Sequence, residues 1–177
     1  MVRTEPPRKT RSAGASSTAQ AATASTQPTP NARPTPEKTA RFTSTSEGVD
    51  VEIHPDAGAL RIDVTFASGA GYCIVRGDLD LELPENFDLA FDLRAGGDLR
   101  PNDLELKLIT PETTEGTDVW WVNRRTLRFP REWQTLHSRR RSFEFAWGPS
   151  GGREPLAHLA AIEFATASAE GVSGSVC

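Results

Sequence analysis

The chain has 177 residues, with 20 Lys/Arg and 24 Asp/Glu, and its formal net charge at pH 7 is -4. This length suits one domain with a tail. Residues 1–41 carry seven Lys/Arg against two Asp/Glu, whereas residues 42–177 carry thirteen against twenty-two. The larger part is therefore acidic, which argues against nucleic acid as a partner because phosphate binding needs a positive face.

The first 41 residues are rich in Ser, Thr, Ala and Pro, with scattered Arg and Lys. A segment of this composition cannot bury enough apolar surface to offset the entropy lost on ordering. We therefore expect residues 1–41 to form a disordered tail or linker. They contain no apolar run long enough for a signal-peptide core or a membrane span, so no signal peptide is visible.

From Phe42 onward the sequence predicts strands, because apolar residues recur at every second position. The segments with a strand-like pattern, some of them short, are 49–53, 60–66, 71–75, 79–83, 87–93, 104–108, 119–122, 133–136, 143–147 and 159–165. Parallel strands need crossover connections of about a dozen residues or more, usually helical, and the loops here are too short. We therefore predict an all-β fold over residues 42–177, an antiparallel β-sandwich of about eight to nine strands.

Three of the four tryptophans lie between residues 119 and 136. Neighbouring side chains of a strand point to opposite faces, so Trp120 and Trp121 cannot both enter one core. An outward tryptophan beside Asn and Arg would form a binding platform, whereas a loop that covers it would make it structural. We expect Trp133 to lie in the core. The candidate ligand-binding residues are Trp120, Trp121, Asn123, Arg124 and Arg125.

The two cysteines, Cys73 and Cys177, could form a disulfide, but Cys73 lies in an apolar run and is more simply interpreted as a small core residue. The three histidines are scattered, and no metal-binding spacing such as CxxC or HExxH is present. We therefore expect no cofactor. The acidic residues worth testing as calcium ligands are Glu47, Asp50 and Glu52, although a solvated strand face is the simpler explanation for them.

The sequence also lacks the usual marks of catalysis: there is no nucleophile elbow, no Gly-rich phosphate loop and no Cys/His arrangement. Many carboxylates could pair by chance as in a glycosidase, but none is singled out. Asp and Glu at alternate strand positions are the expected solvent-facing side chains. We therefore predict that this chain is not an enzyme.

The order of several strands resembles a known family. An alternating Phe-Asp-Leu-Ala-Phe-Asp-Leu strand from Phe87 precedes a Leu-Glu-Leu-Lys-Leu strand, the tryptophan strand, Trp133-Gln-Thr-Leu and a closing Leu-Ala-Ala-Ile-Glu-Phe-Ala strand. This order resembles the galactose-binding-like jelly rolls, which include factor 5/8 type C (discoidin) domains and carbohydrate-binding modules of bacterial glycoside hydrolases. The resemblance covers residues 42–176.

The resemblance implies a non-catalytic carbohydrate-binding module, accessory to a glycoside hydrolase or another surface or secreted protein. Its partners would be a glycan or polysaccharide and a downstream catalytic domain, and its location extracellular or periplasmic. Family members that hold a structural calcium often draw a ligand from the final strand. Here a turn at 169–174 is followed only by Ser175, Val176 and Cys177, so we expect a C-terminally truncated domain and do not carry the calcium site over.

A second interpretation stays open. The sandwich could instead be a structural or protein-docking domain, with the Trp/Arg patch at residues 120–125 as an interdomain contact, since Trp and Arg are typical anchors of protein interfaces.

Overall fold

The computed structural model describes residues 42–56, 58–66, 71–168 and 172–177, and the predicted disordered tail at 1–41 lies outside the described residues. The described residues form twelve strands and one short 3-10 helix. None of their helices is long and apolar enough to cross a membrane. The elements are β1 (Phe42–Glu47), β2 (Asp50–Asp56), β3 (Ala59–Phe66), β4 (Gly71–Glu82), β5 (Asp88–Leu93), β6 (Ala95–Gly97), β7 (Asn102–Ile109), β8 (Val119–Leu127), β9 (Gln134–Arg139), η1 (Arg140–Ser142), β10 (Glu144–Trp147), β11 (His158–Ser168) and β12 (Val172–Val176).

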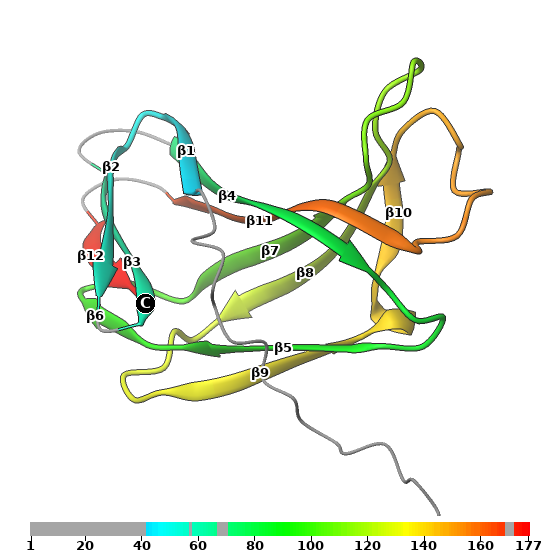
Figure 1. Cartoon of the computed structure of the whole chain (residues 1–177). Helices are drawn as coiled ribbons and strands as arrows, with labels where there is room; N and C mark the ends of the chain where they lie inside the picture. The colour runs from blue at the N-terminus through cyan, green and yellow to red at the C-terminus, as the bar shows by residue number, and fades with distance from the viewer. Residues whose placement is uncertain (1–41, 57, 67–70, 169–171) are drawn as a thin grey trace, which may run out of the picture. The chain divides into compact units, whose positions relative to one another are not determined.

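These strands form three antiparallel sheets (Figure 1). The largest has six strands in the order β1-β4-β11-β7-β8-β10, the second has four in the order β2-β3-β12-β6, and β5 pairs with β9. The β5–β9 pair lies beneath the six-stranded sheet in Figure 1, and the four-stranded sheet lies at one end. The predicted antiparallel β-sandwich is therefore confirmed.

The main core lies between the six-stranded sheet and the β5–β9 pair. Leu106 and Leu108 of β7 point into it and are almost fully buried. From the opposite side, Phe91 of β5 meets Phe164 of β11 edge to face, with ring centroids 5.1 Å apart. Burial of these alternating apolar side chains is the main force that holds the layers together.

Two strand predictions differ from the structure. The segments 71–75 and 79–83 belong to one strand, β4, because Arg76 and Gly77 keep their pairing with β11. The predicted turn at 169–174 is also wrong over its last residues: Val172–Val176 forms β12, which pairs with β3 on one side and β6 on the other. β12 thus lies between two partner strands, and the expected C-terminal truncation stays a prediction.

The expectation that Trp133 lies in the core is wrong, because its side chain is 48% exposed. Trp133 lies in the connection that leads from β8 to β9, just before β9 begins, and Leu136 enters the core instead. The strands on either side of this connection belong to different sheets, since β8 pairs with β7 and β10 whereas β9 pairs with β5.

Both cysteines are free thiols. Cys73 is only 3% exposed and packs with Val64 and Phe66, which confirms that it is a core residue. Burial raises the pKa of the Cys73 thiol above its ordinary value, because a thiolate is poorly solvated there. Cys177 is partly exposed.

We expect the two thiols to react at very different rates with a disulfide reagent at pH 8. Cys177 should react in the folded protein, whereas Cys73 should react only on unfolding, because the thiolate is the nucleophile and burial disfavours it. Absorbance during titration with and without denaturant measures this. The Cys177→Ser variant is the control, and a fast thiol in that folded variant would contradict the assignment.

A matched pair of Leu→Ala substitutions tests the core. Leu108→Ala should lower the free energy of unfolding by about 2–5 kcal/mol, because it removes buried methyl groups and leaves a cavity. Leu81→Ala, at a position that is 49% exposed, should change it by no more than about 0.5 kcal/mol. Chemical denaturation of both variants measures the difference, and equal losses would mean that the core is misplaced.

Candidate functional site

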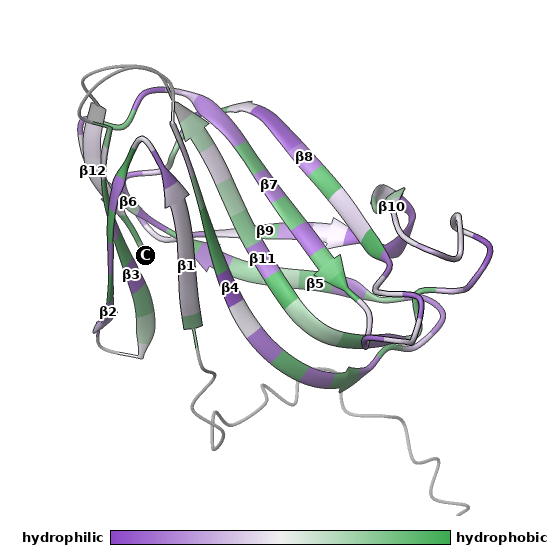
Figure 2. Cartoon of the chain, turned by 90° about the horizontal axis from the view of Figure 1, so that it is seen from above, coloured by the Kyte–Doolittle hydropathy of each residue, from purple (hydrophilic) through white to green (hydrophobic). Residues whose placement is uncertain are grey.

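The outer face of the six-stranded sheet, which points away from the core, is the candidate site. In Figure 2 the view is onto this face, and β5 and β9 pass behind it. The strand registers align five side chains in one row across the sheet: Arg76, Glu163, Lys107, Trp121 and Glu144. Because directly paired residues point to the same side, this row projects from one face.

Two further rows flank the first on the same face. One consists of Asp78, Ala161, Ile109, Val119 and Trp147, and the other of Ile74, Ala165, Glu105 and Asn123. Both positions that β11 contributes to these flanking rows are alanines. Both alanines are buried, and Ala161 packs with Ile109 and Val119 in a small apolar cluster, so the accessible part of the face lies at the charged and aromatic side chains around it.

The aromatic part of the outer face consists of Trp121 and Trp147. Trp147 is 53% exposed, whereas Trp121 is partly buried. The Lys107 ammonium lies 5.6 Å from the centroid of the Trp147 ring, within the range of a cation–π contact. An exposed indole held by a neighbouring cation offers a flat apolar surface to a ligand.

Four charged side chains of the outer face are held in ion pairs. Lys107 Nζ lies 3.3 Å from Glu105 Oε2, and Arg76 Nη1 lies 3.3 Å from Glu163 Oε1. Lys107 and Glu163 are also largely shielded from solvent. Pairing fixes the positions of these donors and acceptors, so they can receive hydroxyl groups with little further loss of side-chain entropy.

A bulge at the end of β8 shapes the region around Asn123. The register between β7 and β8 shifts between Asn102 and Leu104, and Thr126 adopts a left-handed backbone with φ 52°. Asp103 accepts the backbone N–H of Thr126 at 2.8 Å and the Asn123 amide at 3.5 Å. The Asn123 Oδ1 atom is buried and has no hydrogen-bond partner among the described residues.

The structure divides the predicted binding residues between two faces of β8. Trp121 and Asn123 lie on the outer face, and Arg125 is exposed at the bulge. Trp120 and Arg124 point inward, and Trp120 is only 8% exposed. The five residues therefore do not form one surface patch, and the docking interpretation stays a prediction. No ligand contact tests the five, so their binding role stays a prediction.

Trp120 and Arg124, the two inward-pointing residues, contact other residues inside the domain. Trp120 meets Phe145 edge to face at 5.6 Å, and the Arg140 guanidinium lies 4.5 Å from the Trp120 ring centroid. Arg124 donates to Ser138 Oγ at 3.0 Å and to the His137 carbonyl. These contacts fasten β8 to β9, β10 and the short helix η1.

Sequence reasoning missed Trp147 as a surface residue. The alternation of Phe143, Phe145 and Trp147 places all three on one face, but the pairing of β10 with β8 shifts between Phe145 and Trp147. This bulge turns Trp147 to the outer face while Phe145 stays with the core. Lys107 and Glu163 were missed because a charged residue in an alternating strand gives no sign of its cross-strand neighbours.

Among the described residues, no group of three or more His, Cys, Asp or Glu side chains is placed to hold a metal ion. The histidines lie in three separate places, and each contacts a carboxylate at 2.8–3.3 Å: His54 with Glu52, His137 with Asp88, and His158 with Asp80.

The backbone at Thr126 generates a stability prediction. Thr126→Gly should raise the free energy of unfolding by up to about 1 kcal/mol, because a β-branched residue is strained at positive φ and glycine is not. Thr45→Gly, in the exposed edge strand β1, should lower it by roughly 0.5–1 kcal/mol. Urea denaturation compares the two, and destabilisation of both by the same amount would argue against strain at the bulge.

No family model matches the sequence, and no curated protein matches it. Similar solved structures include the following three. The family 11 carbohydrate-binding module from Clostridium thermocellum, in complex with a β-1,3-1,4-mixed-linked tetrasaccharide, is 19% identical with a TM-score of 0.60, over 79% of this chain and 87% of that one. The family 11 module of the cellulosomal cellulase Lic26A-Cel5E of the same organism is also 19% identical, with a TM-score of 0.57 over 79% and 86%.

The third is a structure of carbohydrate-binding modules from the β-sandwich superfamily, described for promiscuous specificity. It is 9% identical, with a TM-score of 0.52, over 78% of this chain and 55% of that one. The chain thus has the β-sandwich jelly-roll fold of carbohydrate-binding modules, which confirms the predicted resemblance at the level of fold.

Proposed function

We propose that this chain is a non-catalytic carbohydrate-binding module whose outer face binds a saccharide. The observation that carries the proposal is the position of Trp121 and Trp147 beside the paired side chains of Lys107 and Glu105 on that face. The fold supports it, since one structure with the same fold holds a tetrasaccharide.

The chemistry of these groups suits a sugar. A pyranose ring has apolar C–H faces that stack on an indole, and Trp147 is exposed enough to receive one. Sugar hydroxyls both donate and accept hydrogen bonds, so they can donate to Glu105 and Glu163 and accept from Lys107 and Arg76. Asn123 and Arg125 extend the polar groups towards the bulge, whereas Trp120 and Arg124 support β8 from inside.

The carboxylates of this face act as acceptors rather than as catalytic acids in the proposal. Glu105 and Glu163 are each tied to a cation at 3.3 Å, so their oxygens are oriented by Lys107 and Arg76. A glycosidase would instead need two carboxyl groups set on either side of one bond, with one of them carrying a proton. Binding without cleavage is the function that the ion pairs favour.

A wider role follows from the same proposal. A module of this kind would hold a glycan or polysaccharide close to a catalytic domain elsewhere in a longer protein, in an extracellular or periplasmic setting. The cellulosomal cellulase that carries one of the similar modules is an example of such an arrangement.

Three Trp→Ala variants test the binding face. Trp147→Ala and Trp121→Ala should each weaken binding roughly tenfold or more, because a buried aromatic contact at the centre of an interface commonly contributes at least 1–2 kcal/mol. Trp133→Ala is the matched control, since Trp133 lies in the β8–β9 connection and belongs to none of the three rows of the outer face. Its affinity should equal that of the wild type.

The measurement is calorimetry with a panel of neutral oligosaccharides and polysaccharides that begins with mixed-linked β-glucan. Intrinsic fluorescence gives a second readout, because stacking on an indole changes its emission. If the wild type binds no member of the panel, or if Trp133→Ala loses affinity as much as Trp147→Ala, the proposed face is wrong.

A further inference from the structure

A pocket of about 260 Å³ lies away from the outer face, where β3, β6 and β12 meet the loop that precedes β9. Its lining includes three arginines, Arg61, Arg94 and Arg131, together with Asp56, Ser175 and Cys177. None of these residues belongs to the three rows of the outer face.

The backbone brings the three arginines together from distant parts of the chain. β12 pairs with β3 and β6, and this ladder continues beyond β12 through two hydrogen bonds between Arg94 and Cys177, at 2.8 and 2.9 Å. Arg61 and Arg94 consequently flank the end of β12. The Ala95 N–H donates to the Pro130 carbonyl at 2.7 Å, which holds the loop with Arg131 beside them.

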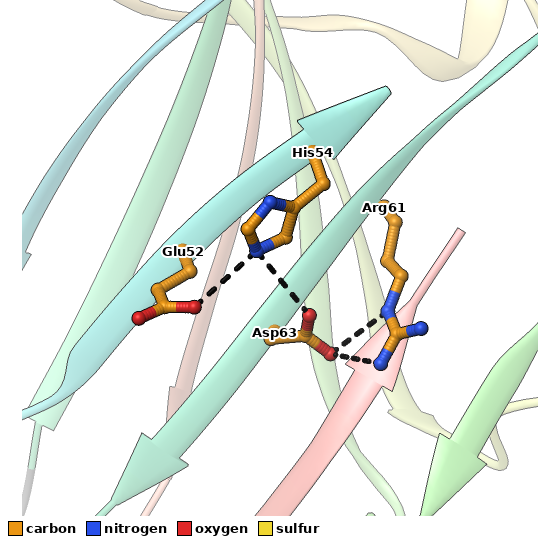
Figure 3. Close-up of polar contacts among 4 residues, drawn as sticks. All are labelled: Glu52, His54, Arg61 and Asp63. Atoms are coloured by element: carbon orange, nitrogen blue, oxygen red, sulfur yellow. Dashed lines mark hydrogen bonds and ion pairs between the residues drawn. The ribbon is translucent and has the colours of Figure 1, made fainter. Parts of the chain in front are cut away.

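Each guanidinium group is oriented by a contact that leaves part of it available. Arg61 donates through Nε and Nη2 to one oxygen of Asp63, at 3.0 and 2.9 Å, and its third nitrogen points away (Figure 3). Arg131 donates through Nη1 to the Gly97 carbonyl. Arg94 lies over the Trp133 ring, 4.8 Å from its centroid, and pairs with no carboxylate of the described residues.

This grouping of arginines contrasts with the acidic composition of the domain. Residues 42–177 carry thirteen Lys/Arg against twenty-two Asp/Glu, yet the pocket lining brings three arginines together. The negative groups near Arg61 are Asp63, Asp56 and Cys177, whereas Arg94 and Arg131 have no ion pair with a carboxylate of the described residues. Like charges that converge raise each other's energy, and an anion between them would relieve it. The planar fork of arginine matches the geometry of carboxylate and sulfate groups.

We propose that this pocket is a second ligand site of the domain and takes an oxyanion, the carboxylate or sulfate of an acidic saccharide. Ligand pockets for whole small molecules have volumes of about 300–1,000 Å³, so this pocket suits one charged group or one ring. The oxyanion chemistry rests on the three arginines alone, and the saccharide as its carrier rests on the proposed function.

The test is calorimetry at low ionic strength with four probes: an oligogalacturonate, a sulfated oligosaccharide, a neutral β-glucan oligosaccharide and free sulfate. The wild type should bind at least one acidic saccharide. Arg94→Gln and Arg131→Gln should each weaken that binding about tenfold or more, because a charge-assisted hydrogen bond is lost. Arg94→Lys should restore part of it, and Arg141→Gln, in the exposed helix η1, should leave it unchanged.

Two further measurements distinguish binding in this pocket from binding on the outer face and test the effect of a terminal carboxylate. Trp147→Ala should weaken neutral β-glucan binding and leave the acidic saccharide bound, so failure of the outer face is distinguishable from failure of this pocket. A chain extended by Gly-Ser after Cys177 should bind the acidic saccharide at least as tightly, because any terminal carboxylate then lies farther from the arginines.

The proposal is overturned if the wild type binds no acidic saccharide, if only free sulfate binds, or if Arg141→Gln weakens binding as much as Arg94→Gln. Thermal unfolding of each variant confirms that it is folded before its affinity is compared.

Discussion

The register between β7 and β8 is the constraint on which the candidate site depends. It places Leu108 opposite Trp120 on the inner face and Lys107 opposite Trp121 on the outer face. A slip by one residue would turn Lys107 towards the apolar core and Leu108 towards the outer face, and the loss of apolar burial would be large. The packing of Trp120 between Phe145 and Arg140 therefore fixes the position of Trp121, although Trp120 touches no ligand in the proposed function.

Two bulges, one in β10 and one at the end of β8, then change which side chains lie on the outer face. The bulge in β10 places Trp147 on the opposite face from Phe145. The bulge at the end of β8 allows Asp103 to accept hydrogen bonds from both the Asn123 amide and the backbone N–H of Thr126. Regular strands alone would give an outer face with one partly buried tryptophan. The irregular pairings add the exposed ring, in keeping with the frequent presence of β-bulges near functional sites.

Much of the fold could be predicted from the sequence, because alternation in segments such as 87–93 and 104–108 reports directly on which residues are buried. The opposite orientations of Trp120 and Trp121 followed from the same rule. The rest could not be predicted, since alternation gives no sheet order. Trp133 was misplaced because the sequence gives no sign that it lies in the connection before β9. The arginine pocket could not be predicted either, because Arg61, Arg94 and Arg131 are brought together only by long-range strand pairing.

The central position of β12 in the four-stranded sheet has a consequence for how the domain folds. β12 lies between β3 and β6, so β6 has no link to that sheet until residues 172–176 have left the ribosome. More than 100 residues separate β12 from β3 along the chain, so the loop that this pairing closes is long and its entropy opposes nucleation there. Folding of the domain should accordingly be slow, with the four-stranded sheet completed after synthesis of the strands that build the outer face.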